Sequence, residues 1–269
     1  MSYRVNTFLE GLQVFVSLVF LFYASWSDLK TREVSDRVWA LFAPAGLALT
    51  LTQIFFFEAN SNEQLYWFGI SAGVTSVLAV GLFYAGAYGG ADAKALICLS
   101  LTLPFYPTNF INWASDSPIF PLSVFSNAVI IAALSVVYVL LRNVVWRQRT
   151  GKQFFEGFKE VSKGRKFLTL LSGYKIRLDK LEKDEFLYPL EDAQVSETGE
   201  TKRTLVVFPK DEERGDIVQR IVATAKQEKN IDWVWVTPGL PMLVFITVGL
   251  IVALVFGDFV WIALAHLLA

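Results

Sequence analysis

Two aspartates, Asp28 and Asp92, are the residues of this sequence best suited to acid–base chemistry. Asp28 stands at the end of the first long apolar segment, and Asp92 follows the third. Two carboxyl groups held close together cannot easily both ionise, so one keeps a proton while the other stays charged. The charged carboxyl can take a proton from water, and the protonated one can donate to a peptide carbonyl or a leaving amine. Such a pair would carry out aspartic hydrolysis.

Two glycines, Gly89 and Gly90, precede the second aspartate. Because they lack side chains, the backbone of an extended substrate can approach closely at this point. A simpler interpretation stays open, since an aspartate at a helix end beside basic residues often only marks the edge of a membrane.

A serine nucleophile is also conceivable, because residues 69–73 read Gly-Ile-Ser-Ala-Gly and match the G-x-S-x-G pattern. That pattern needs a turn between a strand and a helix, whereas these residues lie inside an apolar segment. The only histidine able to act as a base, His266, stands near the far end of the chain. We therefore interpret Gly69 and Gly73 as a helix-packing face of small residues.

The composition points to an integral membrane protein. Of the 269 residues, 54% are hydrophobic and 18% are charged, and the mean hydropathy is +0.45. Soluble domains average about 45–50% apolar and about 25% charged residues. A net charge of −1 gives no reason to expect nucleic acid. One cysteine and one histidine cannot supply a zinc tetrad or a disulfide framework, so we expect no metal site.

The elements that must position the aspartates are six apolar segments. A bilayer span needs about 20 mostly apolar residues. A cleaved signal peptide is a poor interpretation of the first segment, because one basic residue precedes it and the apolar run is long. The fourth segment is short and contains two prolines, and Gly257-Asp258 divides the sixth. The segments are residues 8–26, 38–57, 65–88, 95–111, 119–141 and 240–268.

The basic residues predict the orientation. Lysine and arginine occur in the loops at 28–37 and 88–95 and at the start of the polar stretch after residue 141, but not in 58–64 or 112–118. Cytoplasmic loops carry the basic residues. Both termini are therefore predicted to lie outside, and both aspartates at the cytoplasmic face of a multi-pass protein of the cytoplasmic membrane.

The polar stretch of residues 142–237 predicts a small cytoplasmic α/β domain. Apolar residues alternate with charged ones from Tyr174 to Asp179, which is the period of a strand. Residues 204–208 and 233–236 are rich in strand formers, and 211–229 show a helical pattern. The predicted fold is an α-helical membrane protein of about six transmembrane helices. Its parts are a five-span domain (1–141), this insert (142–237) and a C-terminal span (238–269).

The segments around the two aspartates resemble the active-site segments of the type IV prepilin peptidase family, a group of membrane aspartic proteases. The first family pattern, D-x-x-x-R-x-[IV]-x-[DN], is matched by Asp28, Arg32, Val34 and Asp36. The second pattern is G-x-G-D, often followed by x-K. Residues 89–94 keep its first glycine, its aspartate and its lysine.

One departure from the second pattern points to a branch of the family. Ala91 replaces the glycine just before the aspartate, as in preflagellin and archaeal prepilin peptidases. Residues 233–241, which lead into the last span, also resemble the tail of archaeal members. Bacterial members often carry a four-cysteine insert and also methylate the new N-terminus, and the single cysteine here implies a peptidase without methylation.

The resemblance implies an aspartic endopeptidase with Asp28 and Asp92 as catalytic residues. Its implied substrates are precursors of type IV pilin-like proteins or archaellins, cut at the cytoplasmic membrane face after a short basic leader. The implied partners are therefore these precursors and the lipid bilayer, and no cofactor is implied. The acidic run at 182–200 is predicted to attract the basic leader, although a solvated loop of no consequence explains it equally well.

Two other functions stay open at this point. One is an intramembrane aspartic protease resembling presenilin or signal peptide peptidase, but the Tyr-Asp dipeptide and the Pro-Ala-Leu segment of those enzymes do not occur here. The other is a transporter or membrane scaffold in which both aspartates are structural or relay protons.

Overall fold

The computed structural model describes residues 2–57, 60–107, 119–158, 160–184, 186–195, 201–206, 214–227, 231–239 and 241–268. The chain folds as two compact units. The helical unit contains Met1–Ala132 and Pro241–Ala269, and the mixed unit contains Ala133–Leu240. The fold confirms the prediction of a helical membrane protein with a small α/β domain.

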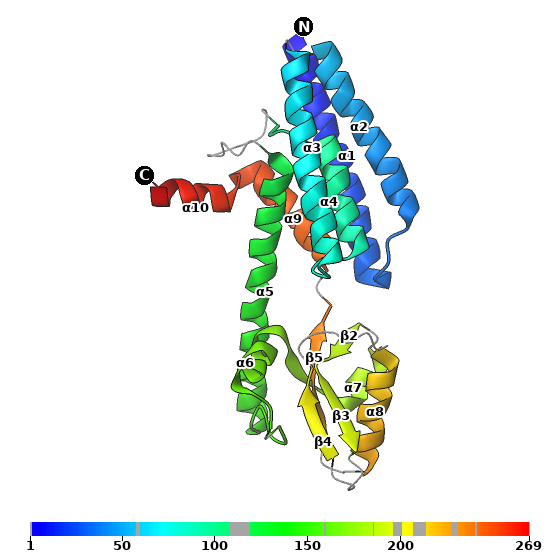
Figure 1. The fold of residues 1–269 in the computed structure, drawn as a ribbon, viewed down its shortest axis with the longest axis vertical. Coiled ribbons are helices and arrows are strands. Elements are labelled where there is room, and N and C mark those ends of the chain that lie inside the picture. The colour runs from blue at the N-terminus through cyan, green and yellow to red at the C-terminus, as the bar shows by residue number, and fades with distance from the viewer. Residues whose placement is uncertain are drawn as a thin grey trace. The chain divides into compact units, whose positions relative to one another are not determined.

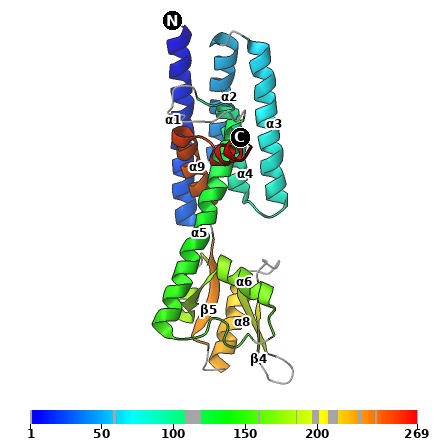
Figure 2. The same ribbon diagram turned by 90° about the vertical axis from the view of Figure 1, so that its left-hand side faces the viewer.

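The helical unit contains α1 (Ser2–Thr31), α2 (Asp36–Phe57), α3 (Ser61–Tyr84), α4 (Gly90–Thr102), the first part of α5 (Phe120–Thr150), α9 (Met242–Phe256) and α10 (Phe259–Leu268). Figures 1 and 2 show α1 to α4 running alongside one another. Within the described residues, α1, α2, α3 and α5 are long and apolar enough to cross a membrane. The shorter α4 ends two residues before Pro104, which has no N–H to continue a helix. The predicted segment 95–111 is therefore not one continuous helix.

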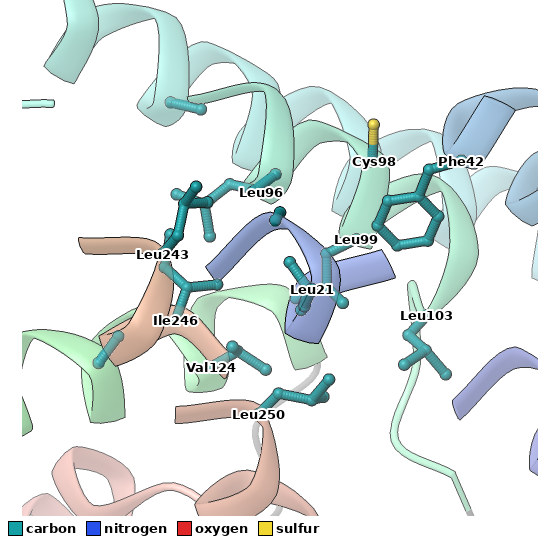
Figure 3. Close-up of a cluster of buried hydrophobic side chains, with 14 of the residues drawn as sticks. Leu21, Phe42, Leu96, Cys98, Leu99, Leu103, Val124, Leu243, Ile246 and Leu250 are labelled. Carbon is teal, nitrogen blue, oxygen red and sulfur yellow. The ribbon is translucent and has the colours of Figure 1, made fainter. Parts of the chain in front are cut away.

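Within the described residues, an apolar core joins α1, α2, α3, α4, α5 and α9 (Figure 3). Its fully buried side chains include Leu21 of α1, Phe42 of α2, Leu96 and Leu99 of α4, and Ile246 of α9. In lipid, helices associate through close packing and polar contacts rather than through the hydrophobic effect.

The contact between α2 and α4 shows both close packing and a polar contact. Gly46 lies so close to Thr102 that an added Cβ would collide with the threonine side chain. Thr50 Oγ1, one turn further along α2, donates to the carbonyl oxygen of Thr102 over 3.1 Å. Gly46 therefore lets α2 and α4 approach each other closely.

The predicted glycine face of α3 is wrong. Among the residues that the structure describes, a Cβ added at Gly69 or Gly73 would meet no atom within 4 Å, so neither glycine mediates close packing there. The buried positions of α3 are Ser71, Thr75 and Ala79, which recur every four residues. Ser71 Oγ donates to the carbonyl oxygen of Pro104 over 2.8 Å, which also commits this hydroxyl to a structural contact.

The last apolar segment is divided where the sequence predicts it. Gly257 has a φ of 82°, a conformation that favours glycine, and it separates α9 from α10. Asp258 Oδ1 accepts from the backbone N–H groups of Val260 (2.9 Å) and Trp261 (3.1 Å), so this aspartate caps α10. Ser126 of α5 donates to the same oxygen over 3.0 Å. Asp258 thus has a structural role, because it caps α10 and links it to α5.

The mixed unit contains two small antiparallel sheets and several helices. One sheet has the order β1 (Tyr174–Arg177), β5 (Trp233–Pro238) and β2 (Leu187–Pro189), and the other pairs β3 (Glu191–Val195) with β4 (Thr201–Leu205). The helices are α6 (Lys163–Ser172), α7 (Leu178–Lys183), α8 (Arg214–Gln227) and the last part of α5. The strand predicted from Tyr174 to Asp179 is confirmed as β1, which ends at Arg177 where α7 begins. The strand predicted at 233–236 and the helix predicted at 211–229 are confirmed as β5 and α8. The strand expected at 204–208 begins earlier, as β4, and residues 207–208 lie outside the described residues.

Candidate active site

Asp28 lies one turn before the end of α1, where several hydrogen bonds fix the backbone as the helix ends. Arg32 has a φ of 57° and its N–H donates to the Asp28 carbonyl oxygen over 2.9 Å, which ends the helix. The hydroxyls of Ser27 (2.8 Å) and Thr31 (3.0 Å) both donate to the carbonyl oxygen of Glu33. The polar residues after the first span therefore fix the backbone around Asp28.

Asp92 lies in the first turn of α4. Its Oδ2 accepts a hydrogen bond from the backbone N–H of Gly89 over 3.0 Å, which satisfies one donor at the helix start. A negative charge in the first turn of a helix is also favoured by the helix dipole. A Cβ added at Gly89 would lie 3.0 Å from the same oxygen, so glycine is suited to this position. The Asp92 carboxyl is thus oriented by its own loop.

The fold brings the two aspartates within electrostatic reach of each other. The charge of Asp28 acts on the Asp92 carboxyl, although 63 residues separate them in the sequence. Both side chains are half-buried. Helix α2 packs against both α1 and α4, and Ser25 of α1 and Thr247 of α9 share a hydrogen bond of 2.8 Å one turn before Asp28. The carboxyl pair therefore rests on several packed helices.

An ion pair that the sequence analysis did not predict links two of the motif positions. Lys94 Nζ lies 2.6 Å from Asp36 Oδ1, and the two side chains are 46% and 85% exposed. The pair ties the start of α4 to the start of α2, close to both aspartates in the sequence. The sequence feature that could have indicated this ion pair is the presence of a lysine and an aspartate in separate motifs at the same predicted membrane edge.

The remaining candidates lie elsewhere. His266 is exposed on α10, and Ser71 is buried within α3. Of the two glycines, Gly89 is exposed and Gly90 is half-buried. Their role in substrate approach stays a prediction.

A separate cavity of about 480 Å³ does not contain either aspartate. Its lining includes Asn6, Glu10 and Gln13 of α1 and Trp67 of α3. At 1.5 Å per residue, Glu10 lies about 27 Å along α1 from Asp28. The aspartates therefore occupy the opposite end of the helix from this hollow.

The acidic run at 182–200 does not form one exposed surface. Glu191 is 1% exposed and accepts from Arg203 over 2.6 Å and from the backbone N–H of Trp235 over 3.1 Å. Asp192 is also 1% exposed, and two nitrogens of Arg220 donate to its two oxygens, each over 3.1 Å. These two acids hold the mixed unit together, so the prediction that they attract a leader peptide is wrong.

The other acids of this run divide into two groups. Glu182 and Asp184 are exposed. Glu185, Glu197 and Glu200 lie outside the described residues.

Two family matches together cover most of the chain. The type IV leader peptidase family matches residues 15–137, which include both aspartates, and the archaeal peptidase A24 C-terminus, type II, matches residues 165–259. The preflagellin peptidase of Methanococcus voltae is 26% identical over 251 residues, which cover 90% of this chain and 94% of that protein.

Two further relatives agree with this match. The preflagellin peptidase of Methanocaldococcus jannaschii is 26% identical over 250 residues, or 90% of this chain and 93% of that protein. A prepilin peptidase of Methanothermobacter thermautotrophicus is 29% identical over 167 residues, or 56% of this chain and 41% of that protein. The chain therefore belongs to the type IV leader peptidase family, in its archaeal branch.

Proposed function

We propose that this protein is a membrane aspartic endopeptidase that removes the short basic leader from archaellin or type IV pilin-like precursors, with Asp28 and Asp92 as its catalytic pair. The observation that carries the proposal is the pairing itself. The family match covers two aspartates from different helices, and the fold brings them within electrostatic reach while leaving both partly accessible.

In the proposed reaction, one carboxyl is charged and the other is protonated. The charged carboxyl takes a proton from water as the water oxygen bonds to the scissile carbonyl carbon, and the protonated carboxyl gives its proton to the carbonyl oxygen. The resulting diol then collapses. Its hydroxyl proton returns to the second carboxyl, the first carboxyl protonates the amine, and the carbon–nitrogen bond breaks. Both aspartates are thereby restored to their starting states.

The proposed location of the reaction follows from the basic loops. With both termini outside, the C-terminal end of α1 and the N-terminal end of α4 lie at the cytoplasmic face. A basic leader stays in the cytoplasm while the apolar segment that follows it rests in the bilayer. The bond between leader and mature protein then lies at the depth of Asp28 and Asp92. The mixed unit is proposed to be cytoplasmic, with residues 142–237 as the functional insert.

The test is cleavage of a purified precursor archaellin by the full-length protein in detergent. Asp28→Asn and Asp92→Asn should each lower the cleavage rate by at least about a thousandfold, because each carboxyl exchanges a proton in every turnover. Glu63→Gln, at an exposed carboxyl in the first turn of α3, and Ser71→Ala should cleave normally.

Two outcomes would contradict the proposal. Full activity of either aspartate variant would remove that residue from the reaction. A transporter or scaffold would give no cleavage even with the unaltered protein.

A further inference from the structure

Tyr88 lies directly before the Gly89–Asp92 turn. Its side chain is 9% exposed, and its ring lies 5.9 Å from the ring of Phe125 on α5. Within the described residues, its hydroxyl is buried and has no hydrogen-bond partner. Buried hydroxyls nearly always find a partner, because leaving one unpaired costs stability. Tyr88 shares this property with several other buried side chains, but it is the one next in sequence to the turn that orients Asp92, so its O–H is a candidate donor for that carboxyl.

The position of Tyr88 relative to Asp92 is set by the backbone. The N–H of Tyr88 donates to the Leu82 carbonyl oxygen of α3 over 3.2 Å, while the next N–H, that of Gly89, donates to Asp92 Oδ2 over 3.0 Å. The charge of Asp92 acts on the Tyr88 phenol. The phenol is thus buried within electrostatic reach of the carboxyl, at the point where the chain passes from α3 to α4.

The surrounding loop allows a small movement of the ring. Gly86 has a φ of 71°, and Gly89 and Gly90 follow Tyr88 directly. Three glycines within five residues give the backbone on both sides of Tyr88 more freedom than other residues would. A shift of this short loop on substrate binding can bring the phenol to the carboxyl without disturbing either helix.

We propose that Tyr88 is a positioning residue for Asp92: when substrate binds, its O–H donates a hydrogen bond to the Asp92 carboxylate. This inference rests on the proposed function. The bond favours the charged form of Asp92 and fixes its orientation, which prepares that carboxyl to take a proton from water. Tyr88 itself neither touches the scissile bond nor changes its protonation state.

Two charged groups near Asp92 are described. The charge of Asp28 on α1 acts on Asp92, and like charges disfavour each other. On its own helix, Lys94 is paired with Asp36 of α2. Tyr88 is therefore well placed to offset the repulsion that Asp28 exerts on a charged Asp92.

The test is Tyr88→Phe in the full-length enzyme, which keeps the ring and its contact with Phe125 and removes only the hydroxyl. We expect kcat to fall ten- to a hundredfold with little change in KM, and the acidic limb of the kcat–pH profile to move to higher pH. Thermal stability should be unchanged or slightly higher, because the lost hydroxyl is unpaired in the free enzyme. The matched control is Tyr84→Phe, at a tyrosine 82% exposed at the end of α3, which should behave as the unaltered enzyme.

Three results would overturn the inference. The first is an unchanged kcat and pH profile in Tyr88→Phe. The second is a loss of activity accompanied by a lower unfolding temperature and an unmoved pH profile, which would show a packing role. The third is an undiminished effect of Tyr88→Phe in an Asp92→Asn background that retains measurable activity. Failure of the proposed function would be recognised separately, by normal cleavage in Asp92→Asn alone.

Discussion

The two units of this protein differ in how deeply their carboxyls are buried and in which groups bind them. In the mixed unit, Glu191 and Asp192 are almost fully buried, and each is bound by an arginine. In the helical unit, Asp28 and Asp92 are half-buried; the charge of Arg32 acts on Asp28, and Asp92 accepts from the backbone N–H of Gly89. A buried carboxyl that is bound by an arginine stabilises the fold, and removing it leaves the arginine without its partner. A half-buried carboxyl with a second carboxyl within electrostatic reach is suited to exchanging protons, as the proposed hydrolysis requires.

The largest loss of stability is expected when a carboxyl that is bound by an arginine is removed. Glu191→Ala should lower the free energy of unfolding of the mixed unit by about 3 kcal/mol, because it leaves the guanidinium of Arg203 and the N–H of Trp235 buried without their acceptor. Thermal unfolding followed by tryptophan fluorescence measures the loss. Glu182→Ala, at an exposed acid of α7, is the control. A stability within 0.5 kcal/mol of the unaltered protein (roughly the effect of a surface change) would refute the structural role.

The second paired acid should have a smaller effect. Asp192→Asn keeps one acceptor for Arg220 but loses the charge, and Arg220 is one-third exposed, so water replaces part of the interaction. We expect a loss of about 1–2 kcal/mol in the same unfolding experiment. A loss as large as that of Glu191→Ala would mean that exposure of the arginine does not matter here.

The buried lysine of the mixed unit gives a pH-dependent test. Lys175 is 7% exposed between the rings of Trp146 (4.9 Å) and Trp235 (5.6 Å), and burial lowers its pKa to about 8, although the charge of Glu191 opposes this shift. In the unfolded chain the pKa returns to 10.5. Between these values the unfolded state binds more protons, so the contribution of Lys175 to stability rises as the pH rises from about 8 to 10.5.

Lys175→Met should abolish this rise. The unfolding temperature of the unaltered protein should therefore rise relative to that of the variant from pH 7 to pH 10, since the other titrating groups are common to both. A difference that stays constant over this range would show that the lysine is not desolvated as the structure indicates.

The smallest change in stability is expected for the two aspartates of the helical unit. Asp28→Asn and Asp92→Asn should change the stability of the helical unit by less than about 0.5 kcal/mol, because an amide oxygen can still accept from Gly89 and the mutual repulsion is relieved. Unfolding temperatures in detergent, measured on the same preparations as the cleavage rates, test this. A large destabilisation would place these aspartates with Glu191 as structural residues.

Much of the fold could be predicted because it depends on local composition. The long apolar helices, the break at Gly257 and the strands of β1 and β5 follow from runs and periods within each segment. The two aspartates could be singled out because they stand at helix ends in recognisable motifs. The features that the sequence did not reveal depend on distant partners. Whether an acid is exposed or buried depended on arginines elsewhere in the chain, as Asp192 and Arg220 show.

The same limit explains the errors on α3 and α4. Gly69 and Gly73 have the spacing of a packing face, but the face that is buried depends on which neighbours the helix meets, and these meet Ser71 instead. The pairing of Lys94 with Asp36 likewise requires α2 and α4 to be neighbours. A single sequence specifies the elements better than it specifies their contacts.

The shortness of α4 and α9 has a consequence for the bilayer around the two aspartates. At 1.5 Å per residue, their 13 and 15 residues extend about 20 and 22 Å, whereas the hydrocarbon layer is about 30 Å thick. A bilayer adapts to short helices by thinning locally. Because α4 carries Asp92 and α9 packs on α1 one turn before Asp28, we expect the thinned region to include the aspartates. Hydrophobic mismatch would then keep this end of α1 and α4 close to the aqueous surface, where water reaches the aspartates directly.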